Sequence, residues 1–191
     1  MLEAAAAGDA AAAERALAAG APVDARDPRG RTPLLLATIG DHVDVARVLV
    51  AAGADVDAQN DQRDSPFLYA GAEGRLDVLR VLLEAGPDLA STNRYGGTAL
   101  IPAAHHGHVE TVRELLGTGV DVDHVNRLGW TALLEAIILG DGGPAHTEIV
   151  RLLLDAGADP GLPDGEGTTP LEHARARGYG EIERLLAAAG G

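Results

Sequence analysis

The 191-residue chain contains no cysteine and no lysine, and its aromatic residues are limited to one Phe, one Trp and three Tyr. The missing cysteine excludes disulfides, zinc–thiolate sites and cysteine nucleophiles. No run of about 18 apolar residues occurs, so no membrane-spanning helix is expected. The Ala-rich N-terminus has no early basic residue and therefore does not look like a secretory signal. Because neither a membrane span nor a secretory signal is expected, we expect a cytoplasmic protein.

Positive charge is also scarce, because 15 arginines face 29 acidic residues and leave a net charge of −14. Nucleic-acid-binding proteins normally present a basic surface. The composition therefore argues against a nucleic-acid partner. It suits a soluble monomer, or a partner protein that carries a basic patch.

What the chain does have is a repeat. One glycine follows each apolar helical pattern at intervals of 33, 33, 33, 38 and 33 residues, at Gly20, Gly53, Gly86, Gly119, Gly157 and Gly190. A second series marks the expected helix starts, at Thr32, Ser65, Thr98, Thr131 and Thr169. Both series gain the same five residues in the same unit. A fixed period of this length is typical of solenoid proteins.

The unit GRTPLLLATIGDHVDVARVLVAAGADVDAQN shows how each repeat is expected to fold. Thr32 is a good N-cap, and Pro33 suits the first helical position, where no N–H is needed. Val45 and Leu49 give a second helix its apolar face at helical spacing. Gly53 is expected to end that helix in the left-handed conformation.

The same pattern recurs in SPFLYAGAEGRLDVLRVLLEAGPDLASTN and TALIPAAHHGHVETVRELLGTGVDVDHVN. Over essentially the whole chain, this pattern resembles the ankyrin-repeat family. The resemblance implies an all-α solenoid, a stack of helix-turn-helix units with β-hairpin-like fingers. We expect a single domain, 1–191, with an N-terminal cap at 1–31, repeats at 32–64, 65–97, 98–130 and 131–168, and a C-terminal cap at 169–191. The stretch NRLGWTALLEAIILGDGGP is similar, more narrowly, to small bacterial ankyrin-repeat proteins with a Gly-rich insert in the penultimate repeat.

The family usually binds partner proteins with its finger tips and first helices, on the concave side. Positions on this face that differ between repeats are therefore the candidates for recognition, and aromatic residues and arginine are the usual interface anchors. The predicted protein-binding residues are Tyr69, Arg94, Tyr95, His105, His106, Arg127, Leu128, Trp130, Glu135, Ile138 and Leu139. Two alternatives stay open: Trp130 could instead pack across its own finger, and the insert could cover Ile138 and Leu139.

Two irregularities carry expectations of their own. The insert Asp141–Ala145 is expected to form a loop, because Gly142, Gly143 and Pro144 cannot continue a helix. Such a loop could belong to a binding face or be a tolerated insertion. Arg63 stands where the other fingers have glycine, so the finger NDQRDS is expected to be looser or differently shaped.

No catalytic motif is found, so we expect no enzyme activity and no cofactor. The chain has two serines, and Ser65 is a helix cap rather than part of a nucleophile elbow. The cluster His105, His106 and His108 is a poor metal site, because adjacent histidines on a helix point in different directions and no cysteine supports them. A non-enzymatic protein-interaction module is therefore predicted. The alternatives are a small-ligand or metal site near the insert, and a stability factor for a bacterial redox or stress enzyme.

Overall fold

The structure, a computed structural model, describes residues 1–190, and over these residues it contains helices and no strand. The helices are α1 Leu2–Ala7, α2 Ala10–Ala18, α3 Pro33–Ile39, α4 Val43–Ala51, α5 Pro66–Ala72, α6 Leu76–Glu84, α7 Leu100–His105, α8 Val109–Leu116, α9 Ala132–Ile138, α10 Pro144–Asp155, α11 Pro170–Arg177 and α12 Gly180–Ala188. Each repeat contributes a short first helix and a second helix, so the predicted all-α, helix-turn-helix class is confirmed. Over residues 1–190, every helix is too short or too polar to span a lipid bilayer.

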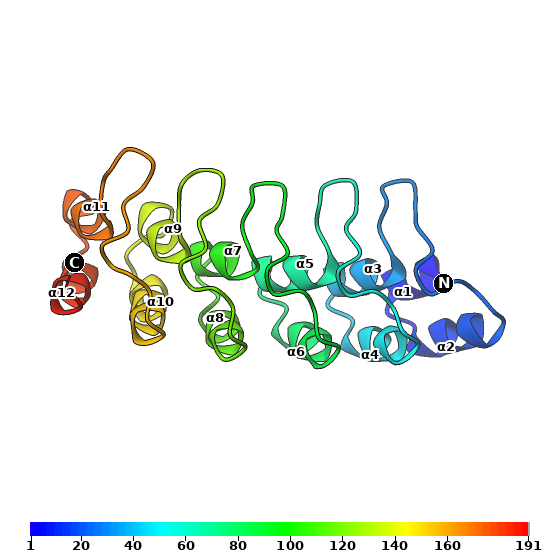
Figure 1. Cartoon of the computed structure of the whole chain (residues 1–191). Coiled ribbons are helices and arrows are strands. Elements are labelled where there is room, and N and C mark those ends of the chain that lie inside the picture. Colours follow the sequence, from blue (N-terminus) through cyan, green and yellow to red (C-terminus); the bar gives the residue numbers. More distant parts are fainter. Residues whose placement is uncertain (191) are drawn as a thin grey trace. The chain divides into compact units, whose positions relative to one another are not determined.

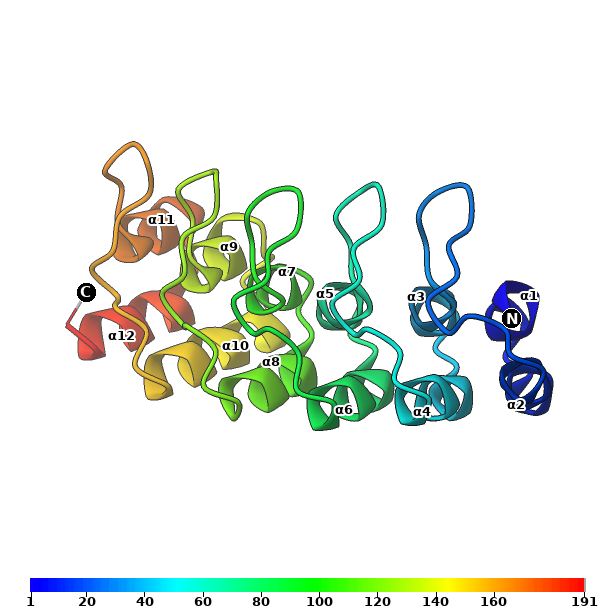
Figure 2. The same ribbon diagram turned by 45° about the vertical axis from the view of Figure 1, so that its right-hand side comes forward.

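The chain divides into two compact units. The first comprises Met1–Gly71 and Arg75–Arg94, and the second comprises Ala72–Gly74 and the chain from Tyr95 onward. In the second unit, α7, α9 and α11 pack in one row and α8, α10 and α12 in another (Figure 1, Figure 2). In the first unit, α1 packs on α3, and α2, α4 and α6 form the second row. Within each unit, the hairpin-like loops before the first helices extend away from the second helices (Figure 1).

Most first helices begin at the predicted cap. The hydroxyl oxygens of Thr32, Ser65 and Thr131 accept hydrogen bonds from the backbone N–H three residues later, over 3.1–3.2 Å. Thr169 forms a complete capping box with Glu172. These bonds satisfy backbone donors that a helix start leaves open.

Thr98 is the exception, and its predicted capping role is wrong. The helix α7 starts later, at Leu100, and the buried Thr98 hydroxyl makes no hydrogen bond within the described residues. In the other repeats, the residue four places after the cap donates its N–H to the carbonyl of the cap residue, as in Leu36 to Thr32 at 3.0 Å. Here that residue is Pro102, which has no N–H to donate. The first hydrogen bond of the helix is therefore lost, and its start moves inward.

At the start of three second helices, a side chain bonds to a backbone carbonyl of the preceding repeat. The ring of His42 bonds through Nε2 to the Ala6 carbonyl at 3.3 Å, and that of His146 bonds in the same way to the His105 carbonyl at 2.9 Å. The Tyr179 hydroxyl donates to the Gly140 carbonyl at 3.0 Å. Because a carbonyl only accepts, each of these side chains must be the donor. The series forms a ladder of ties between neighbouring repeats.

The finger with Arg63 closes like its neighbours, so the expectation of a different shape is wrong. Arg63 takes a φ of 63°, against 72° to 85° for the glycines at the same place in the other fingers. Its N–H donates to the Asn60 carbonyl at 3.0 Å, and the N–H of Asn60 donates to the Asp64 carbonyl at 3.0 Å. The side chain of Asn60 also accepts from two backbone N–H groups of the same turn. These bonds hold Arg63 in a conformation that L residues disfavour.

The insert is only partly a loop, because Pro144 and Ala145 belong to α10. This helix has 12 residues, whereas α4, α6 and α12 have 9 each. Pro144 takes the first helical position, where proline is favoured, and the chain reverses at Gly142, with a φ of 68°. The five inserted residues therefore supply about one additional helical turn together with a short connection.

Candidate functional site

The fingers are built by one polar side chain at the base of each turn. Asn126 accepts hydrogen bonds from the N–H groups of Leu128 and Trp130, at 2.9 and 3.1 Å. The N–H of Asn126 donates to the Trp130 carbonyl at 3.0 Å and closes the loop. Asp27, Asn60 and Asp164 do the same in their fingers. Asx side chains stabilise tight turns in this way, so the residues between them are presented in a fixed conformation.

Two neighbouring fingers of the second unit are joined at their tips. The N–H of Arg127 donates to the Tyr95 carbonyl at 2.9 Å. Nε2 of His124 donates to the Gly96 carbonyl at 2.7 Å. Tyr95, Arg127 and Leu128 were predicted to belong to one binding surface, and these two bonds bring them to adjacent tips.

The exposed large apolar side chains of the described residues all belong to this second unit. Tyr95 and Leu128 are each 53% exposed, Val125 is 51% exposed and Leu139 is 43% exposed. Among residues 1–190 no other large hydrophobic side chain is exposed. All four lie on fingers or at the end of a first helix, and none lies on a second helix. The exposure of Leu139 also shows that the insert leaves it uncovered.

Val125 was not predicted. At the equivalent positions, Arg26 donates to the Gln59 carbonyl at 2.7 Å and Gln59 donates to the Thr92 carbonyl at 2.9 Å. A polar side chain thus ties one finger to the next in the first unit. Valine cannot make this bond, and comparing the repeats at this position could have identified it.

Glu135 was predicted to contact a partner, but only 7% of it is exposed. Its Oε1 accepts from Nδ2 of Asn126 at 2.8 Å, and its Oε2 lies 3.8 Å from Nδ1 of His105. Burial raises the pKa of Glu135. Burial also lowers the pKa of His105, and the nearby His106 and His146 lower it further. Glu135 therefore has a supporting role: it orients the Asn126 amide, which in turn holds the 126–130 finger.

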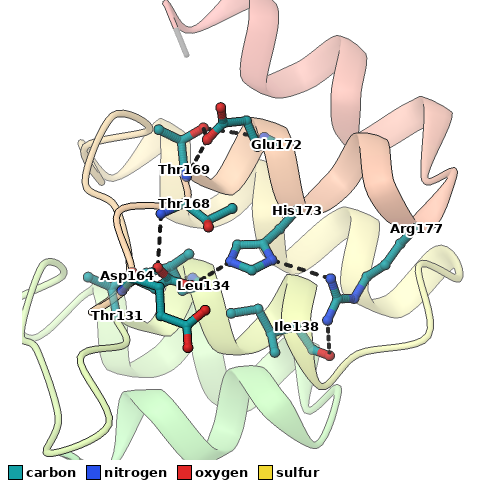
Figure 3. Close-up of polar contacts among 10 residues, drawn as sticks. Thr131, Leu134, Ile138, Asp164, Thr168, Thr169, Glu172, His173 and Arg177 are labelled. Atoms are coloured by element: carbon teal, nitrogen blue, oxygen red, sulfur yellow. Dashed lines mark hydrogen bonds and ion pairs between the residues drawn. The ribbon is translucent and has the colours of Figure 1, made fainter.

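The next finger is supported in the same way, as Figure 3 shows. Nε2 of His173 lies 2.7 Å from Oδ2 of Asp164, again nine residues apart in the chain. Arg177 contacts Nδ1 of the same ring at 3.3 Å and donates to the Ile138 carbonyl at 3.2 Å. The hydrogen bonds of Thr168 and then of His173 hold the pKa of Asp164 below its usual value. The backbone of the predicted Ile138 is thus used structurally, and its side chain is half-buried.

The remaining predicted residues are distributed over both units. In the second unit, Trp130 is half-buried, and the exposed His106 donates from Nδ1 to the Ala72 carbonyl at 2.6 Å. In the first unit, Arg94 is exposed and Tyr69 is half-buried. Tyr69 lines a cavity of about 340 Å³ together with Arg29, Arg31, Ile39, Asn60, Asp61, Gln62 and Asp64.

The insert faces the second helices. Asp141 accepts from the N–H of Gly143 at 2.8 Å and lies 2.7 Å from Nδ1 of His146. A cavity of about 410 Å³ beside it is lined by Gly142, Gly143, Pro144, Thr147, Glu148, Arg151 and Glu181. This lining includes none of the histidines or the tryptophan expected for a small-ligand site. Over residues 1–190, no group of three or more His, Asp or Glu side chains could hold a metal ion.

Comparison with known proteins agrees with this architecture. A family model described as ankyrin repeats (3 copies) matches residues 1–93 and 86–164. The ankyrin repeat protein YahD of Escherichia coli (strain K12) is 59% identical over 56 residues, which span 29% of this chain and 28% of that protein.

Similar crystal structures cover nearly the whole chain. An ankyrin repeat domain from Acinetobacter baumannii AYE is 57% identical, with a TM-score of 0.96 over 98% of this chain and 96% of that one. The ankyrin repeat protein EF0377 is 42% identical, with a TM-score of 0.94 over 97% and 95% of the two chains. The ankyrin repeat domain of Bcl-3, a member of the IkappaB protein family, is 30% identical, with a TM-score of 0.88 over 98% and 84%.

Ankyrin repeats are generally protein–protein interaction modules, and the family is typically non-enzymatic. The helix-turn-helix repeats, the fingers and these relatives lead to one conclusion: the chain belongs to the ankyrin-repeat family.

Proposed function

We propose that the chain is a non-enzymatic interaction module that binds a partner protein with the finger tips and first helices of its second unit. Tyr95, Val125 and Leu128 form the centre of the contact, and we call these three residues the tip patch. The observation that carries the proposal is the distribution of exposed apolar side chains. Soluble proteins seldom leave such side chains clustered unless they bind something.

The proposal also draws on how firmly the tip patch is held. Asn126 fixes the conformation of the finger that presents Leu128, and Glu135 fixes Asn126. The bond between Arg127 and Tyr95 fixes the neighbouring tip. A prearranged surface loses little conformational entropy when it binds, which favours affinity.

The test is capture of partner proteins from a lysate of the source organism by the immobilised full chain. The double variant Tyr95→Ala/Leu128→Ala should lose at least one captured protein, because truncating a central apolar anchor costs about 2 kcal/mol or more. The double variant Arg47→Ala/Arg113→Ala, which truncates two exposed second-helix side chains, is the control and should retain it. Both variants should melt within a few degrees of the wild type. Equal capture by all three proteins would refute the tip patch as the contact.

A further inference from the structure

Exposed carboxylates are absent from the two fingers and helix starts that carry the tip patch, and the buried Glu135 follows directly after them. Residues 95–106 and 124–134 include two consecutive finger tips, together with α7 and the first half of α9. These 23 residues hold no Asp or Glu, although 29 acidic residues in 191 would place three or four there at the average density. Their basic side chains are Arg127, His105, His106 and His124.

Much of the acidic charge of this unit lies on the second helices and the segments that flank them. Residues 107–123 carry one arginine, Arg113, and four carboxylates, Glu110, Glu114, Asp121 and Asp123. Residues 140–161 repeat the pattern, with Arg151 and the four carboxylates Asp141, Glu148, Asp155 and Asp159. The net charge of −14 is therefore not spread evenly. Carboxylates of this unit also occur on the next finger, at Asp164 and Glu166, and on α11, at Glu172.

We propose that the tip patch recognises an acidic, apolar polypeptide segment. Such a segment places an apolar side chain against Tyr95 and Leu128 and a carboxylate near the guanidinium of Arg127. Arginine pairs well with carboxylates, and an apolar contact beside a charge pair is a common interface arrangement. This inference rests on the proposed function, since it specifies the chemistry of the partner at the same surface.

The separation of charge also decides how such a partner would approach. An acidic segment is repelled by the second helices and meets no carboxylate at the two tips 95–97 and 127–129, so long-range attraction and repulsion favour this part of the surface. A partner with a basic patch, which the net charge alone suggested, would be drawn to the second helices. It would then leave the exposed apolar side chains uncovered. The location of the charge therefore favours an acidic partner over a basic one.

The experiment is a selection of random 12-residue peptides, displayed on phage, against the immobilised full chain in 150 mM NaCl. Enriched peptides are synthesised, and their binding to the variants is measured by fluorescence anisotropy. Arg127→Glu tests the charge at the tip patch, and Arg47→Glu makes the same change of net charge on the second helix α4. Tyr95→Ala/Leu128→Ala tests the apolar contact.

We expect the enriched peptides to combine Asp or Glu with large apolar residues and to be poor in Arg and Lys. Arg127→Glu should weaken their binding about tenfold or more, and Arg47→Glu should change it less than about twofold. Enrichment of basic peptides that still need Tyr95 and Leu128 would overturn the acidic partner and leave the proposed function standing. Binding that depends on neither residue, or no enrichment over the bare support, would count against both.

Discussion

Replacing Arg63 by glycine should stabilise the protein, because this residue is held in a left-handed conformation by the finger around it. The left-handed conformation destabilises the folded state by about 1–2 kcal/mol for an L residue and by essentially nothing for glycine. Glycine in turn gives the unfolded chain more freedom, which offsets roughly 0.5 kcal/mol of the gain. The exposed Arg63 side chain makes no hydrogen bond or ion pair with the described residues, so little else is lost. The net gain should be about 1 kcal/mol, or roughly 2–4 °C in melting temperature for a chain of this size.

Urea unfolding followed by circular dichroism would measure this gain as a higher midpoint with an unchanged slope. Arg63→Ala removes the side chain and keeps the strained backbone, so it should stay within about 0.5 kcal/mol of the wild type. Gln62→Gly places the same glycine one position earlier, outside the left-handed region, and should not stabilise. If Arg63→Gly proves no more stable than Arg63→Ala, the conformational argument is wrong.

Three further changes test other parts of the structure. Burial raises the folded-state pKa of Glu135, so the stability that this group contributes is present below its unfolded pKa and is lost as pH rises through the folded one. Glu135→Gln should therefore unfold at higher urea than the wild type at pH 8, and this advantage should shrink below about pH 4. Gly142→Ala should cost about 2 kcal/mol, because its φ is positive and the new methyl would meet the Tyr179 ring. Gly143→Ala, next to it, should cost less by the same unfolding assay. Asp164→Ala should speed hydrogen exchange of the finger amides at 166–168 and leave those at 128–130 protected, and slow exchange at 166–168 would contradict the turn described here.

The repeat grammar predicted the fold well, because each signal acts locally. Threonine caps, the glycines that end the second helices and the apolar spacing all depend on residues within a few positions. The late start of α7 does not follow from the cap series, because Thr98 fits that series while Pro102 removes the hydrogen bond that would start the helix there. Arg63 was misjudged because propensity describes a residue alone, whereas four hydrogen bonds of its finger act on it together.

The candidate site was harder to predict, because exposure depends on neighbours that the sequence does not place. Glu135 occupies a position that faces the fingers, but Asn126 and His105 hold it beneath the surface. The exposure of Val125 is explained only by comparison with the equivalent residues Arg26 and Gln59. Their polar side chains join neighbouring fingers, which valine cannot do. Tyr95 and Leu128 were predicted from their residue types; both are 53% exposed, and their binding role stays a prediction.

The ladder of ties at the start of the second helices has a consequence for how such a chain can change over generations. Every acceptor in it is a main-chain carbonyl, which any amino acid supplies, so each repeat encodes only its own donor. A duplicated repeat therefore finds a carbonyl acceptor for this hydrogen bond in any neighbouring repeat. For this hydrogen bond alone, copying a segment of one period requires no compensating substitution in the neighbouring repeat.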